Sequence, residues 1–220
     1  MSDFALYNYF RSSTSYRIRI ALNLKQIKYD YKPVHLLKDG GEQYKLDYRK
    51  LNPASGVPTL KHNDFVVSQT MAIVEYLDQV APERPLIPKD VKMGAKIRRF
   101  CETINADIHA YGNLKTLNYL TNEMGQTDEV KHKFVQYWFT RGFQSLEEML
   151  AEHGGTCCFG NQVTAADAFL IPLIFTAERF KVDLSKFPLA TAINERLLKL
   201  PEFASAHPYR QPDTPQDLRI

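Results

Sequence analysis

A cluster of prolines divides this chain into two parts with different patterns. Three of them lie close together, Pro82, Pro85 and Pro88. Proline lacks the backbone N–H of regular structure and clashes with the preceding helical turn, so neither a helix nor a central strand can continue through this segment. We therefore predict a linker here that joins two domains, residues 1–84 and 90–220, which suits a chain of 220 residues.

The part before the linker alternates between strand-like and helix-like patterns. Strands are expected at residues 5–10, 29–35, 57–61 and 65–67. Helices are expected at residues 18–24 and 69–80, where apolar residues recur at helical spacing. Asn63 and Asp64 suit the turn of a hairpin between the last two strands. This order predicts an α/β domain with a small mixed sheet covered by helices.

The part after the linker has helical periodicity throughout. Amphipathic or apolar helical segments are expected at residues 91–120, 129–152, 165–177 and 189–197. Pro188 suits the first turn of the last of them. The longest apolar stretch, residues 169–175, is far too short to span a bilayer. An all-helical second domain is therefore expected, without a membrane partner.

Composition narrows the class of protein. Hydrophobic residues make up 44% of the chain and charged residues 24%, as in ordinary soluble globular proteins. A net charge of +3 from 28 basic and 25 acidic residues leaves no basic tract for a phosphate backbone, so a nucleic-acid partner is not expected. The N-terminus lacks the apolar core of a signal peptide, which predicts a cytoplasmic protein.

The cysteines and histidines indicate neither a disulfide framework nor a metal site. Cys101, Cys157 and Cys158 are odd in number, and two of them are adjacent, so we expect reduced thiols that serve packing. The six histidines show no metal-ligand spacing. No metal is expected.

A cluster of hydroxyls stands where the first predicted strand runs into a helix. Ser12, Ser13, Thr14 and Ser15 lie together, with Arg11 before them and another arginine shortly after. The first turn of a helix carries N–H groups without internal partners and the positive end of the dipole, so it stabilises an anion such as a thiolate. Plain N-capping is the alternative, but a cap requires only one Ser or Thr.

These features together resemble the cytosolic glutathione transferases over the whole chain. The run from Ser12 to Arg17, with Arg19, is similar to the zeta-class signature Ser-Ser-Cys-Ser/Ala-x-Arg-x-Arg. Further matching segments are Lys38–Gly41, Leu51–Pro53, Val57–Leu60, Ala177–Leu184 and His207–Pro215. The last two are the most class-specific. The chain thus resembles the maleylacetoacetate isomerase family, with the maleylpyruvate isomerases as near relatives.

The resemblance implies a fold and an activity. It implies a thioredoxin-like, glutathione-binding domain with a mixed four-stranded sheet, and an all-helical domain that contributes the substrate pocket. It also implies a homodimeric, glutathione-dependent cis–trans isomerase that converts maleylacetoacetate to fumarylacetoacetate in tyrosine and phenylalanine catabolism, with glutathione transferase side activity. The alternatives are a maleylpyruvate isomerase, or a protein of this fold that binds without catalysing isomerisation.

Thr14 is the visible departure from the family pattern. The family usually has Cys at this position, whereas maleylpyruvate isomerases carry Thr after their Ser-Gly. The departure leaves the choice between the two substrates open. It also implies that the nucleophilic sulfur belongs to bound glutathione, with Ser12 as the expected hydrogen-bond donor and Ser13, Thr14 and Ser15 as competing candidates.

Other cofactor contacts in the first domain follow from the resemblance. Val57 and Pro58 are expected to form a cis peptide bond whose backbone pairs with the cysteinyl part of glutathione. Gln69 and Thr70 are expected to bind the γ-glutamyl carboxylate at a helix N-terminus, and Gln43 to contact the glycyl end. Without the resemblance, the proline would suit a strand start and Thr70 a simple helix cap.

Substrate and cofactor residues are also expected in the second domain. His109 and Asn113 match positions near the cofactor, although a lone helical His is more often a core or surface residue. Arg179 is expected to bind a carboxylate of the dianionic substrate through its guanidinium. Arg11 and Lys115 are candidates for the other carboxylate, with solvated surface charges as the alternative.

One motif has a structural interpretation. Thr164 and Asp167 have the spacing of a capping box ahead of an apolar run. We therefore expect Asp167 to matter for folding more than for catalysis.

Overall fold

The computed structural model describes residues 2–220, and their contacts form two compact units. Among these residues, one unit comprises 2–86 with Lys199–Ile220, and the other Ile87–Leu198. The break between them falls inside the proline cluster. The sequence analysis assigned residues 199–220 to the C-terminal domain, whereas the structure groups them with the first unit. The reason is that α10 (Pro201–Ala206) packs on α1 (Ser13–Leu24).

The first unit contains the mixed four-stranded sheet that the sequence predicts. Its strands are β1 (Phe4–Asn8), β2 (Asp30–Pro33), β3 (Thr59–His62) and β4 (Phe65–Ser68). The spatial order is β2-β1-β3-β4, with β1 parallel to β2 and the other neighbours antiparallel. In the register of the sheet, Leu6 lies opposite Tyr31 on one side and Leu60 on the other.

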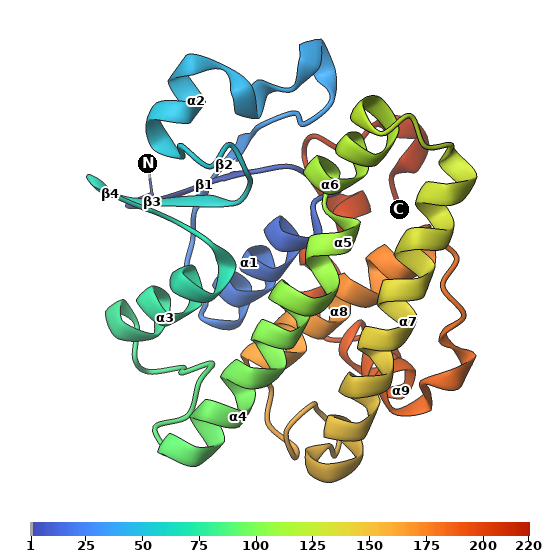
Figure 1. The fold of residues 1–220 in the computed structure, drawn as a ribbon. Helices are drawn as coiled ribbons and strands as arrows, with labels where there is room; N and C mark the ends of the chain where they lie inside the picture. Colours follow the sequence, from blue (N-terminus) through green and yellow to red (C-terminus); the bar gives the residue numbers. More distant parts are fainter. Residues whose placement is uncertain (1) are drawn as a thin grey trace. The chain divides into compact units, whose positions relative to one another are not determined.

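Helices cover both faces of this sheet. In Figure 1, α1 and α3 (Thr70–Val80) lie on one side and α2 (Leu46–Leu51) on the other. Two short 3₁₀ turns, η1 (Lys38–Gly40) and η2 (Glu42–Tyr44), precede α2. Apolar side chains from β1, β3, α1 and α3 are fully buried and form the core of this unit, among them Leu6, Ile18, Leu22, Leu60, Ile73 and Leu77.

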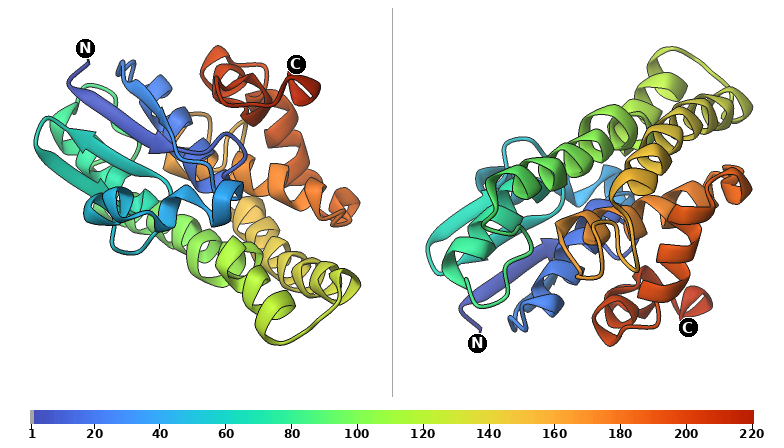
Figure 2. Two further views of the ribbon diagram at one scale, coloured as in Figure 1. Left: turned by 90° about the horizontal axis from the view of Figure 1, so that it is seen from above. Right: turned by 90° about the horizontal axis from the view of Figure 1, so that it is seen from below.

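The second unit is helical, as predicted. Its α-helices are α4 (Val91–Glu102), α5 (Ala110–Gly112), α6 (Leu114–Asn118), α7 (Asp128–His153), α8 (Ala165–Arg179) and α9 (Pro188–Leu197). Two π-helical segments, η3 (Thr103–His109) and η4 (Tyr119–Glu123), and the 3₁₀ turn η5 (Leu184–Lys186) complete it. The run from α4 to α6 lies alongside α7 (Figure 2).

The helix expected over residues 91–120 is therefore interrupted. Asn113 has an extended backbone (φ −71°, ψ 141°), and its side chain accepts a hydrogen bond from the Lys115 N–H at 3.1 Å, so a new helix begins there. Close packing against α7 also constrains this run. A Cβ atom on Gly142 would lie 2.3 Å from a side-chain carbon of Ile108, so only glycine allows the two helices to approach this closely.

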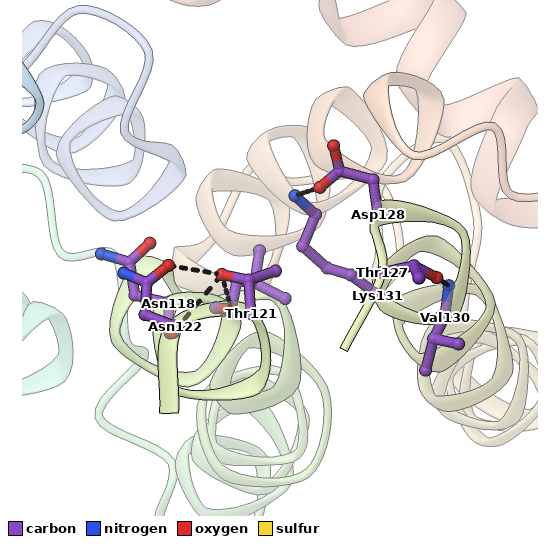
Figure 3. Close-up of polar contacts among 8 residues, drawn as sticks. Asn118, Thr121, Asn122, Thr127, Asp128, Val130 and Lys131 are labelled. Carbon is purple, nitrogen blue, oxygen red and sulfur yellow. Dashed lines mark hydrogen bonds and ion pairs between the residues drawn. The ribbon is translucent and has the colours of Figure 1, made fainter. Parts of the chain in front are cut away.

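Side-chain hydrogen bonds shape the turn between η4 and α7. Thr121 donates to the Leu117 carbonyl at 3.2 Å on the η4 side. The Thr127 hydroxyl accepts from the Val130 N–H at 3.3 Å, and Asp128 pairs with Lys131 in the first turn of α7 (Figure 3). This cap and the acidic first turn explain why the helix begins at Asp128.

Within residues 2–220 the cysteines form no disulfide and are buried, as expected for packing residues. Burial raises the pKa of the Cys158 thiol well above its ordinary value, and the nearby Asp167 adds to the shift. Across residues 2–220, no group of three or more His, Cys, Asp or Glu side chains could hold a metal ion. Within the same residues, no helix is long and apolar enough to cross a membrane.

The C-terminal segment of the first unit contains two 3₁₀ turns, η6 (Pro208–Arg210) and η7 (Gln216–Leu218). His207 caps η6, because its Nδ1 accepts from the Tyr209 N–H at 3.2 Å. Its ring lies between those of Tyr16 and Tyr209, at centroid distances of 6.0 and 5.3 Å. Burial, followed by the charges of Arg210 and Arg19, lowers the pKa of His207 to about 4.

This shift predicts a pH-dependent stability. Between pH 6.5 and 4, an unfolded chain binds a proton at His207 that the native state does not, so the free energy of unfolding falls as the pH falls through this window. His207→Asn keeps a capping acceptor but does not titrate. Urea unfolding at pH 7 and pH 4.5 should show about 1–2 kcal/mol less loss of stability in this variant, because water screens part of the effect at this partly exposed ring. Equal losses in both proteins would contradict the assignment.

Candidate active site

The hydroxyl cluster forms the N-terminus of α1. Ser12 is the N-cap residue, with an extended backbone (φ −70°, ψ 120°). Its Oγ accepts from the Ser15 N–H at 3.2 Å, and its carbonyl accepts from the Tyr16 N–H at 2.9 Å. The N–H groups of Ser13 and Thr14 come before these two at the positive end of the helix. An anion placed here is stabilised by the helix.

Two of the four hydroxyls are linked in a chain. Thr14 Oγ1 donates to the carbonyl of Val57 at 2.8 Å. The Ser12 and Thr14 oxygens are 2.8 Å apart. Since a carbonyl can only accept, the Thr14 proton points to Val57, and the Ser12 proton then points to Thr14. The Ser12 proton becomes available to an incoming anion by one rotation of its hydroxyl.

Burial separates the four candidates for contact with a sulfur atom. Ser12 and Thr14 are partly exposed, whereas Ser13 and Ser15 are buried. Ser15 Oγ also accepts from the Tyr9 N–H at 3.4 Å. An external thiolate therefore reaches the Ser12 and Thr14 hydroxyls more readily than the other two.

The predicted cis peptide bond between Val57 and Pro58 is confirmed. It immediately precedes β3 and places the Val57 carbonyl within hydrogen-bond distance of Thr14. The backbone segment that is expected to pair with a peptide ligand thus lies beside the N-terminus of α1.

A second helix N-terminus lies at Gln69 and Thr70. Gln69 has a positive φ of 73° with ψ 121°, a sparsely populated region for a residue with a Cβ atom, at a cost of about 1–3 kcal/mol. Thr70 begins α3, and its Oγ1 accepts from Nη1 of the fully buried Arg17 at 3.5 Å. A helix N-terminus beside a buried guanidinium is suited to a carboxylate.

Gln43 presents a buried acceptor. Only 2% of this residue is exposed, and its Nε2 donates to the Leu36 carbonyl at 3.2 Å. Its Oε1 has no hydrogen-bond partner within residues 2–220. Gly41 makes room for this side chain, because a Cβ atom there would lie 2.5 Å from Gln43 Nε2. Its φ of 104° also favours glycine. A ligand N–H would satisfy this acceptor.

The remaining predicted residues are distributed over both units. Arg11 is partly exposed in the turn between β1 and α1. His109 ends η3, Asn113 caps α6, and Lys115 is exposed two residues further on. Arg179 is exposed at the end of α8, with its guanidinium 5.7 Å from the centre of the Phe180 ring. Their part in a common site stays a prediction.

The sequence analysis assigned no role to two residues that the structure places at this site. Arg17 and Arg19 are both fully buried on α1. Arginine is rarely buried without partners, and both residues lie in a run that is otherwise apolar. Charged residues within an apolar helical run are the signal that could have identified them.

Comparisons with known proteins show relatives that cover nearly the whole chain. Residues 2–79 match the family model described as glutathione S-transferase, N-terminal domain. A probable maleylacetoacetate isomerase of Vibrio cholerae is 42% identical, over 97% of this chain and 99% of that protein.

Two solved structures have the same fold over nearly the whole chain. A maleylpyruvate isomerase described as a bacterial zeta-class glutathione S-transferase, solved in its holo form, has a TM-score of 0.92 and 37% identity over 96% of this chain and 100% of that one. A maleylacetoacetate isomerase of Methylobacterium extorquens, with bound malonate and glutathione, has a TM-score of 0.91 and 33% identity over 96% and 99%.

Proposed function

We propose that this chain, which belongs to the maleylacetoacetate isomerase family of zeta-class glutathione transferases, is a glutathione-dependent cis–trans isomerase that converts maleylacetoacetate to fumarylacetoacetate. The observation that carries the proposal is the pair of accessible hydroxyls of Ser12 and Thr14 at the N-terminus of α1. A hydroxyl that donates a hydrogen bond and a helix N-terminus both favour a thiolate over a thiol.

Glutathione fits the residues that surround these hydroxyls. When bound, it supplies a thiolate that adds to the cis double bond and leaves after rotation about the resulting single bond. Ser12 donates its hydroxyl proton as a hydrogen bond to the sulfur and so keeps the thiolate at the helix N-terminus. Thr14 holds the Val57 carbonyl and limits the directions in which Ser12 can donate. Ser13 contributes the first N–H of the helix.

The rest of the cofactor is proposed to lie along the first unit. The N-terminus of α3, at Gln69 and Thr70, binds the γ-glutamyl carboxylate, with positive charge from Arg17. The backbone of Val57 before Pro58 pairs with the cysteinyl part. Gln43 Oε1 accepts an N–H from the glycyl end, which satisfies its buried oxygen.

The helical domain is proposed to supply the substrate pocket. In this assignment residues 1–84 bind glutathione, and residues 90–220 contribute His109 and Asn113 to the cofactor. Arg179 pairs with one carboxylate of the substrate through its guanidinium. Arg11 and Lys115 bind the other carboxylate and orient the double bond toward the sulfur.

Maleylpyruvate is the second candidate substrate. Thr14 and the similarity to a solved maleylpyruvate isomerase favour it. We nevertheless expect kcat/KM for maleylacetoacetate to exceed that for maleylpyruvate by at least about tenfold, because relatives that are 42% identical over 97% of the chain are named maleylacetoacetate isomerases. Parallel ultraviolet assays of the two substrates with one enzyme preparation measure this ratio. A ratio below one would reassign the protein as a maleylpyruvate isomerase.

The cellular setting is part of the same proposal. The enzyme acts in tyrosine and phenylalanine catabolism, in the cytoplasm, as a homodimer with some glutathione transferase activity. The three buried thiols, which form no disulfide within residues 2–220, suit a reducing compartment. Light scattering after size-exclusion chromatography should give twice the chain mass of 25.3 kDa. Retention on immobilised glutathione without turnover of either substrate would instead favour the non-catalytic binding protein.

A further inference from the structure

Both backbone groups of Phe10, just before the hydroxyl cluster, are held by charged side chains. Nη2 of Arg19 donates to the Phe10 carbonyl at 2.9 Å. The Phe10 N–H donates to Oδ2 of Asp213 at 3.0 Å. Phe10 is two residues before Ser12, whose own N–H bonds to the Tyr9 carbonyl at 3.1 Å. The turn that leads into α1 is therefore fixed from two directions.

Arg19 joins this turn to the C-terminal segment. Besides Phe10, it donates to Asn8 Oδ1 at 3.0 Å and, through Nε, to the Ala206 carbonyl at 3.0 Å. The guanidinium is fully buried, and burial lowers its pKa, while the nearby tyrosines and Asp213 oppose this shift. The carboxylate of Asp213 thus supplies negative charge near a buried cation as well as an acceptor for Phe10.

The segment that carries Asp213 is itself held in one conformation. Gln211 Nε2 donates to the carbonyls of Ser205 and His207, at 2.9 and 2.8 Å. The Thr214 hydroxyl donates to the Pro208 carbonyl at 2.7 Å. Oδ1 of Asp213 accepts a short hydrogen bond from the Tyr31 hydroxyl. Because these hydrogen bonds hold the segment around Asp213, the contact between Asp213 and Phe10 can set the position of the turn.

We propose that Asp213 is a positioning residue for the thiolate site: by fixing Phe10 it holds the Ser12 hydroxyl and the N-terminus of α1 where the glutathione sulfur binds. This inference rests on the proposed function of the site. It assigns a catalytic consequence to the C-terminal segment, which lies some 200 positions from Ser12 along the chain. Asp213 acts through the backbone and makes no contact with the substrate.

The first test uses the protein without glutathione. Asp213→Asn retains the shape of the side chain but loses its charge and one of its two acceptor oxygens. Asp217→Asn is the matched control, because it removes an exposed carboxylate from the same segment. Hydrogen exchange should become at least about tenfold faster at the amides of residues 10–15 in Asp213→Asn only. Unchanged exchange at these amides would overturn the inference.

The second test reads the thiolate directly. Absorbance at 240 nm during a pH titration of the glutathione complex gives the pKa of the bound thiol. We expect it to rise by about one unit in Asp213→Asn and to stay unchanged in Asp217→Asn. A lower melting temperature with an unchanged thiol pKa would mean a purely structural role and overturn the inference.

The two proposals fail in different ways. If the wild-type protein does not lower the thiol pKa of glutathione, the proposed function is wrong. If the wild-type protein lowers it and Asp213→Asn does so equally, only the positioning role is wrong. Should Asp213→Asn not fold, Asp213→Glu takes its place, since it keeps the charge but displaces the carboxylate. Hydrogen exchange at residues 10–15 and the pKa of the bound thiol then test the positioning role in that variant.

Discussion

Replacing Ser12 by alanine is expected to lower kcat/KM for maleylacetoacetate by about 10²- to 10³-fold at saturating glutathione. The Ser12 hydroxyl is the partly exposed donor at the N-terminus of α1, and its proton is released from Thr14 by one rotation. Its loss removes a hydrogen bond that favours thiolate, so the pKa of the bound thiol should rise as activity falls. Steady-state kinetics and the 240 nm titration measure both effects.

Control variants separate the hydroxyl from the helix cap. Ser12 also caps α1 by accepting from the Ser15 N–H. Ser12→Gly retains most of the capping preference but has no hydroxyl, so it should be as inactive as Ser12→Ala. Ser12→Thr keeps the hydroxyl and should retain most activity. Thr14→Val removes the oxygen that accepts the Ser12 proton. It should lower kcat/KM by no more than about tenfold. Activity near wild type in Ser12→Gly would assign the sulfur contact to another hydroxyl.

Replacing Asp167 by alanine is expected to lower the free energy of unfolding by about 3–5 kcal/mol. Its carboxylate is fully buried and accepts from the N–H groups of Cys158 and Thr164, both at 2.8 Å, and from the Thr164 hydroxyl at 3.2 Å. Burial raises the pKa of this carboxyl, and these hydrogen bonds oppose the shift. Alanine would leave two buried N–H groups without acceptors and remove the capping box of α8.

Asp183 provides a matched control for this prediction. It accepts from the Ser185 N–H at 3.2 Å in the same way, but it is exposed. Asp183→Ala should lower the free energy of unfolding far less, because the N–H group that it leaves behind is open to water. Urea unfolding of both variants measures the difference. Equal destabilisation would contradict the account, and normal kcat in folded Asp167→Ala would support its structural role.

The architecture of the first unit could be predicted because its signals are local. The apolar run at β1, the turn at Asn63 and the helical spacing of α3 each specify an element without distant contacts. The run from Ser12 to Arg17 predicts a cofactor site for the same reason. Its chemistry depends on one strand-to-helix junction, which is contiguous in the sequence.

The contacts that hold this junction in place could not be predicted. Asp213 meets Phe10, and Arg19 meets Ala206, across about 200 residues of chain. No periodicity or capping pattern specifies such pairings, which depend on how the C-terminal segment returns to α1. The interruption of the helical run at Asn113 was missed because its amphipathic pattern continues through the break.

The dependence of isomerisation on glutathione tests the central claim most directly. The ultraviolet loss of maleylacetoacetate is followed with purified enzyme, with and without glutathione, and with S-methyl glutathione, which fills the same site but cannot form a thiolate. We predict turnover only with glutathione, and no consumption of glutathione as fumarylacetoacetate accumulates. Isomerisation at the same rate without glutathione, or with its S-methyl derivative, would contradict the account.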